Sequence, residues 1–109
     1  MALQQALRAI AEPRRLRILQ VIGDSELSAG EVASGFDVTR AAISQHLQVL
    51  AAAGLVTVRR EGTRRLYRTR PEAIAEIRDF LDEYWTGRLT DLKAEAESEE
   101  RRRSDDDPA

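Results

Sequence analysis

The chain has 109 residues, and 17 basic residues stand against 19 acidic ones, so the formal net charge is −2 at pH 7. This length fits one domain, and no apolar run is long enough to cross a membrane. The chain has no cysteine and one histidine, which excludes a disulfide framework and a thiolate or multi-histidine metal site within one chain.

Two short helices are predicted at the start of the chain. Leu3, Leu7 and Ile10 follow the spacing of an amphipathic helix. Pro13 suits the first turn of a second helix, whose apolar residues continue to Ile22 and which a glycine ends.

The next two helices predict a helix-turn-helix. Ser28 and Glu31 form the S-x-x-E pattern of a capping box, which opens a short third helix. Residues 35–38 supply the turn. Thr39 is a good N-cap for a helix over Arg40–Ala53, because its hydroxyl can accept from a free backbone N–H of the first turn.

This fourth helix has two distinct faces. Ile43, Leu47 and Leu50 form an apolar stripe. The opposite face is small, polar and uncharged, and it consists of Ala41, Ser44, Gln45 and Gln48. Such donors and acceptors suit base edges in the major groove of DNA, although a solvated helix face is the plain alternative.

An arginine-rich hairpin follows. Residues 55–60 and 64–68 read as two strands separated by Glu61-Gly62-Thr63, where Gly62 supplies the positive φ of a tight connection. Alternation places Val56 and Val58 on one side of the first strand. Six arginines and one glutamate lie between residues 59 and 70, so the hairpin is a locally basic wing in an otherwise acidic chain. The phosphate backbone of DNA is the expected partner.

Pro71 begins a long amphipathic helix, whose apolar residues recur at spacings of three and four. It needs a second surface, and we expect a second copy of the chain; folding back on its own domain is the alternative. The expected dimer contacts are Leu3, Leu7, Ile10, Ile77, Leu81, Tyr84, Trp85, Leu89 and Leu92. We expect one domain over residues 1–94 and an acidic, disordered tail over 95–109.

The predicted fold class is therefore mainly α with a small β-hairpin wing, a winged helix-turn-helix that is dimeric through a long C-terminal helix. The expected DNA contacts are Thr39, Arg40, Ser44, Gln45, His46, Gln48, Arg59, Arg60, Arg64, Arg65 and Tyr67. Two of these residues have an alternative role. His46 could instead be half-buried and pack its helix against a neighbouring element, and Arg40 could be a solvated charge.

Five segments, in this order and spacing, resemble the ArsR family of bacterial winged-helix repressors. They are Ala11–Leu19, Glu26–Ala33, Ser44–Leu50, Gly54–Val56 and Glu61–Tyr67. The resemblance runs from about Leu3 to Leu92. It implies a homodimer built on the first and last helices that binds an imperfect inverted repeat and represses transcription. It also implies that the Thr39 helix enters the major groove and that the wing reaches the adjacent backbone or minor groove.

The chain departs from the metal-sensing members of that family. Their thiolate motif corresponds to positions held here by Ser28 and Gly30, which cannot ligate a soft metal. Their other site uses histidines and carboxylates on the last helix, but residues 74–92 contain no histidine. We therefore expect no metal and no cofactor, as in the metal-independent, autorepressor-like branch.

The sequence favours a dimeric repressor whose partner is double-stranded DNA, in the cytoplasm and without a membrane, since we find no signal peptide. No nucleophilic cysteine, glycine-rich phosphate loop or second histidine supports an enzyme. Two alternatives stay open: a winged-helix module that binds another protein, and an ArsR-type repressor that an unidentified ligand releases.

Overall fold

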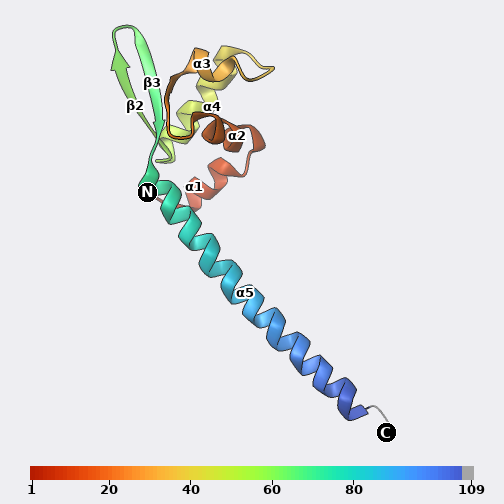
Figure 1. The fold of residues 1–109 in the computed structure, drawn as a ribbon. Coiled ribbons are helices and arrows are strands. Elements are labelled where there is room, and N and C mark those ends of the chain that lie inside the picture. Colours follow the sequence, from red (N-terminus) through yellow and green to blue (C-terminus); the bar gives the residue numbers. More distant parts are fainter. Residues whose placement is uncertain (107–109) are drawn as a thin grey trace. The chain divides into compact units, whose positions relative to one another are not determined.

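The structure, a computed structural model, describes residues 1–106. The elements in chain order are α1 (Leu3–Ile10), α2 (Pro13–Ile22), β1 (Glu26–Ser28), α3 (Ala29–Ala33), α4 (Arg40–Ala52), β2 (Val56–Glu61), β3 (Arg64–Thr69) and α5 (Pro71–Asp106), and Figure 1 labels all of them except β1. Internal contacts divide the chain into two units, and the second begins at Arg78.

The helix ends follow the capping signals in the sequence. Gly23, with φ of +53°, ends α2. Ser28 and Glu31 form the predicted capping box at α3, with each side chain accepting from the other's backbone N–H. At α4, Thr39 Oγ1 accepts from the backbone N–H of Ala42 at 3.1 Å. These bonds satisfy N–H groups that the first turn of each helix leaves unpaired.

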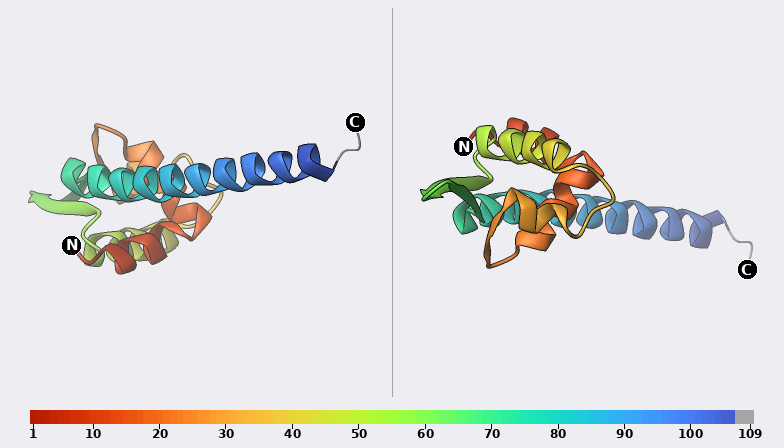
Figure 2. Two further views of the ribbon diagram at one scale, coloured as in Figure 1. Left: turned by 90° about the horizontal axis from the view of Figure 1, so that it is seen from below. Right: turned by 90° about the horizontal axis from the view of Figure 1, so that it is seen from above.

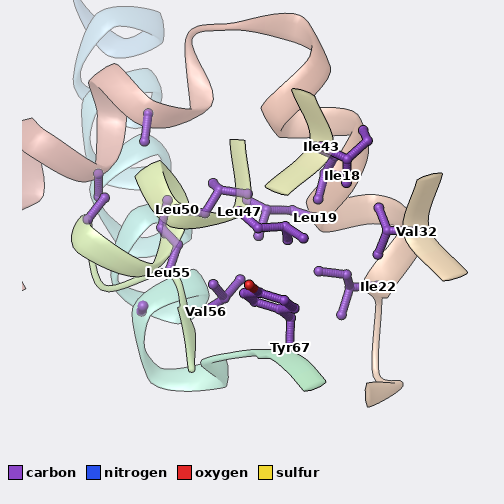
Figure 3. Close-up of a cluster of buried hydrophobic side chains, with 14 of the residues drawn as sticks. Ile18, Leu19, Ile22, Val32, Ile43, Leu47, Leu50, Leu55, Val56 and Tyr67 are labelled. Carbon is purple, nitrogen blue, oxygen red and sulfur yellow. The ribbon is translucent and has the colours of Figure 1, made fainter. Parts of the chain in front are cut away.

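The core of the first unit gathers the apolar faces of the helices and the sheet (Figure 3). The predicted stripe of α4, namely Ile43, Leu47 and Leu50, is fully buried. Both views in Figure 2 place α1 beside α4, and small Ala6 and Ala9 of α1 are buried. Burial of this stripe fixes which side of α4 faces outward, and that is the polar side.

The wing belongs to a three-stranded antiparallel sheet with strand order β1-β3-β2. β1 was not predicted, because three residues carry no readable alternation and their pairing with β3 decides their conformation. Glu61 pairs with Arg64, so the connection has two residues, Gly62 and Thr63, rather than the three expected. Gly62 has φ of +63°, and such two-residue loops match the twist of paired strands. Val56 is buried, whereas Val58 is exposed.

α5 continues to Asp106, so the disordered tail expected over residues 95–109 is helical as far as that residue. Residues 93–103 are mostly Ala, Glu, Lys and Arg, which favour helix. Two ion pairs at i,i+4 spacing, Lys93–Glu97 and Glu99–Arg103, add weak support. Residues 107–109 lie outside the described part. None of the described helices is both long and apolar enough to span a membrane.

Candidate nucleic-acid interface

A groove of about 490 Å³ lies between α4 and the wing, and we call it the α4–wing groove. Its lining residues are Ser28, Ala29, Gly30, Arg40, Ser44, Gln48, Thr63, Arg64, Arg65 and Tyr67. Six of them were expected to contact DNA from the sequence, and they come from α4 and β3. The fold thus brings together, across a hollow, residues that are distant in the chain.

The α4 edge of the groove follows from helical spacing. Arg40, Ser44 and Gln48 are four residues apart, so they share one face. Gly30, in the first turn of α3, lies beside Arg40: a Cβ built on Gly30 would lie 3.8 Å from the Arg40 Cζ, an ordinary van der Waals contact. The guanidinium of Arg40 therefore lies over α3 and faces the hollow.

The other expected contacts on α4 have different positions. Gln45 is exposed but does not line the groove, so it is on the outward face beside it. His46 is half-buried and is also absent from the lining. Thr39 is exposed, and its hydroxyl caps α4.

Arg60 and Arg65 form a like-charged pair on the wing. They lie directly opposite each other in the β2–β3 register, and both are exposed. Within residues 1–103, whose side chains the structure describes, neither arginine forms an ion pair. Like charges at opposed positions destabilise a sheet, and an anion bound across them would relieve the repulsion. The wing thus offers two positive charges to an external anion.

Arg59 has internal partners instead. Its Nε donates to both carboxylate oxygens of Glu26 on β1, at 2.9 Å each, and its Nη2 lies 3.0 Å from Glu61 Oε2. The hydrogen bond from Arg59 lowers the pKa of Glu26, and Glu26 in turn raises the pKa of Arg59. Two carboxylates therefore neutralise an arginine that was expected to hold phosphate.

Arg64 has one ion-pair partner among the described side chains, and it lies at the edge of the groove. Its Nη2 lies 2.5 Å from Glu31 Oε1, the same oxygen that accepts from the backbone N–H of Ser28 at 3.1 Å. Hydrogen bonds from Ser28 and the charge of Arg64 lower the pKa of Glu31. Sequence reasoning missed Glu26 and Glu31 as neighbours of the wing, because each lies 33 residues before its arginine and the unpredicted β1 creates the contact.

Tyr67 does not fit the expected role of a DNA contact. Its side chain is 4% exposed and points into the core beside Val56 in Figure 3. Along β3, Leu66 and Tyr67 are buried whereas Arg65 and Arg68 are exposed, and Tyr67 belongs to the same core cluster as the apolar residues of the helices. Tyr67 forms part of the floor of the groove, and its aromatic ring belongs to the core.

The residues expected at a dimer interface divide into two groups. Ile77 is 6% exposed and belongs to the core of the first unit, so it is not a free surface residue. The half-buried residues Leu3, Leu7 and Ile10 pack against the same core. The exposed group lies on the second unit and consists of Leu81, Tyr84, Trp85, Leu89 and Leu92.

Aromatic contacts shape this exposed face of α5. The rings of Phe80 and Tyr84 are stacked at 6.4 Å, and those of Tyr84 and Trp85 meet edge to face at 5.6 Å. The Arg88 guanidinium lies 5.8 Å from the centroid of the Tyr84 ring. Phe80, which is 38% exposed, was missed by the sequence analysis although it lies one turn before Tyr84.

No group of three or more His, Cys, Asp or Glu side chains that could hold a metal occurs in the described residues of the single chain. Ser28, at one position matched to a metal-binding motif, is used as the cap of α3.

Comparison with known proteins places these features in a family. Residues 10–59 match the family model described as a helix-turn-helix domain. The HTH-type transcriptional regulator Rv2034 of Mycobacterium tuberculosis is 42% identical over 86 residues, which are 79% of this chain and 80% of that protein. The transcriptional activator HlyU of Vibrio cholerae is 47% identical over 55 residues, 50% of this chain and 51% of that protein. The transcriptional repressor SmtB of M. tuberculosis is 37% identical over 73 residues, 67% of this chain and 54% of that protein.

Solved structures of similar proteins point to the same family. A possible transcriptional regulator for arsenical resistance has a TM-score of 0.72 and 41% identity, over 84% of this chain and 95% of that one. The homodimeric winged helix-turn-helix DNA-binding domain of a possible ArsR-family regulator from Mycobacterium bovis has a TM-score of 0.63 and 31% identity, over 76% of this chain and 77% of that one. The chain belongs to the ArsR family of winged helix-turn-helix transcriptional regulators.

Proposed function

We propose that the protein is a homodimeric transcriptional repressor that binds an inverted-repeat operator in double-stranded DNA without a metal sensor site. The α4–wing groove carries this proposal, because it combines uncharged hydrogen-bonding side chains on a helix with arginines on a hairpin. Uncharged side chains that both donate and accept can read base edges, and arginines can bind phosphates.

The roles follow from position and charge. Ser44, Gln45 and Gln48 read base edges, because they are polar, uncharged and on the outward side of α4. Arg40 and the wing residues Arg60, Arg64 and Arg65 hold phosphates or enter a minor groove. We assign a bracing role to Arg59, since Glu26 and Glu61 already neutralise it. Thr39 acts by capping α4.

A second copy of the chain is the proposed partner of α5. A row of large apolar side chains on one helix is costly to leave in water, and Trp85 is 56% exposed. The M. bovis relative described as homodimeric supports this proposal. Two copies related by a twofold axis would place two α4 helices on the two half-sites of an inverted repeat.

The sense of regulation and the absence of a metal are also proposed. The relatives include an activator and a repressor, so both directions occur among similar proteins. Repression requires only that a bound dimer blocks a promoter. The residues at the matched metal positions, Ser28 and Gly30, offer no thiolate, and α5 has no histidine. We assign the protein to the cytoplasm, with no enzymatic role.

Selection of duplexes from a random pool tests the proposal. The purified protein should enrich an inverted repeat in the presence of chelator. Gln48→Ala should relax the preference at one position of each half-site, whereas Gln20→Ala, an exposed glutamine of α2 outside the groove, should not. A pool without enrichment, from a protein that binds no duplex at low salt, would favour the protein-interaction alternative. If the protein left its DNA site only after a fraction of cell extract was added, the ligand-responsive alternative would be favoured.

A further inference from the structure

Glu31 lies where α3 meets the wing. Its Oε1 is shared between the backbone N–H of Ser28 and the guanidinium of Arg64. The side chains of Arg64 and Glu31 are 56% and 48% exposed, and Arg64 lines the α4–wing groove. One of the groove arginines is therefore already paired with a carboxylate, which a phosphate of bound DNA would have to replace.

The two wing ion pairs differ in how easily the arginine can exchange its partner. Arg59 is held by both oxygens of Glu26 and by Glu61, so an incoming phosphate would have to displace three contacts. Among the described side chains, Arg64 has a single carboxylate partner, which it contacts through one nitrogen. When Arg64 leaves, Glu31 keeps its hydrogen bond from Ser28, so its charge retains a donor and α3 stays capped.

We propose that Glu31 competes with DNA for Arg64: it holds the arginine at the groove in the free protein and releases it to a phosphate when DNA binds. This inference rests on the proposed DNA-binding function. Glu31 then acts through Arg64, and the ion pair between them lowers the affinity for DNA of any sequence. Since every duplex must break the same ion pair, the contact lowers non-specific and specific binding alike.

Salt dependence gives the competition a measurable signature. A phosphate contact releases counterions from DNA, which makes binding salt-sensitive. In the wild type, the freed Glu31 carboxylate takes up cations and offsets part of that release. Removing the carboxylate should therefore steepen the plot of log Kobs against log salt concentration.

The test is a fluorescence-anisotropy titration of Glu31→Gln, Arg64→Ala and the double variant against a scrambled duplex, at several salt concentrations. Glutamine keeps an oxygen that can accept from Ser28, so the capping box survives. Asp24→Asn is the matched control: it removes one negative charge at an exposed residue that forms no ion pair with any of the described side chains. Thermal denaturation of each variant verifies that it is folded.

We expect Glu31→Gln to bind about 1.4- to fivefold more tightly at low salt, the range for an exposed ion pair, with a steeper salt slope. The gain should disappear in the Arg64→Ala background and be smaller in Asp24→Asn. An equal gain in Asp24→Asn, a gain that persists without Arg64, or no gain would each overturn the inference. If the wild type bound no duplex, the proposed function itself would fail, and this inference with it.

Discussion

The opposed arginines of the wing predict that stability and DNA binding change in opposite directions. Arg60 and Arg65 face each other across β2 and β3, and like charges in such a pair cost about 0.2 to 1 kcal/mol of folding free energy. Arg65→Ala should therefore leave the free energy of unfolding unchanged or raise it by up to about 1 kcal/mol. If Arg65 served only to stabilise the fold, Arg65→Ala would instead lower the free energy of unfolding and leave DNA affinity unchanged.

The same change should weaken DNA binding through the loss of one phosphate contact. Each lost contact lowers the slope of log Kobs against log salt by about 0.9. Between about 50 and 200 mM salt, the ratio of wild-type to variant affinity should then shrink roughly 3.5-fold, since fourfold more salt raised to the power 0.9 gives that factor. The losses should be the same on specific and scrambled duplexes.

Fluorescence anisotropy over this salt range and chemical denaturation measure the two quantities. Arg17→Ala is the control, because Arg17 is an exposed arginine of α2 outside the lining of the groove. An unchanged salt slope for Arg65→Ala, or a variant destabilised by more than about 1 kcal/mol, would refute the reasoning about this pair.

Three further predictions concern specificity, assembly and pH. Gln45→Ala should cost roughly 1 to 3 kcal/mol on the preferred duplex but little on a scrambled one, and equal losses in anisotropy titrations would reject base reading. Trp85→Ala should shift sedimentation towards monomer, unlike the control Glu83→Ala; a folded Trp85→Ala variant that stays dimeric when dilute would argue against the interface. Hydrogen bonds from Ser28 lower the folded-state pKa of Glu31, so its stabilisation is complete above the ordinary pKa of a glutamate and is lost as pH falls through the lowered value. The difference in melting temperature between wild type and Glu31→Gln should close in that acidic range; a difference that is independent of pH would contradict it.

Much of the fold was readable because its signals are local. Thr39 and Ser28 mark helix starts through side chains that cap the next few residues, and the buried stripe of α4 follows from helical period. The hairpin was predicted from Gly62 and the arginine runs, although its loop is one residue shorter than expected. α5 exceeds its predicted end because charged helix formers continue its last turns.

The missed features depend on contacts between distant segments. β1 exists because β3 offers it a partner, and only this pairing places Glu26 beside Arg59. Tyr67 was expected to contact DNA, but its ring packs into the core of the first unit. The sequence therefore predicted which segments form the groove better than which arginines are free to bind phosphate.

The central claim is tested most directly by an anisotropy titration of the purified protein against the duplex upstream of its own gene and a scrambled duplex of equal length. The titration is run at two salt concentrations and with chelator. A metal-independent repressor acting on its own promoter should bind the upstream duplex tightly and selectively, lose affinity as salt rises, and be unaffected by chelator. Failure to bind either duplex, even at low salt, would contradict the account and favour the alternative that the protein binds another protein.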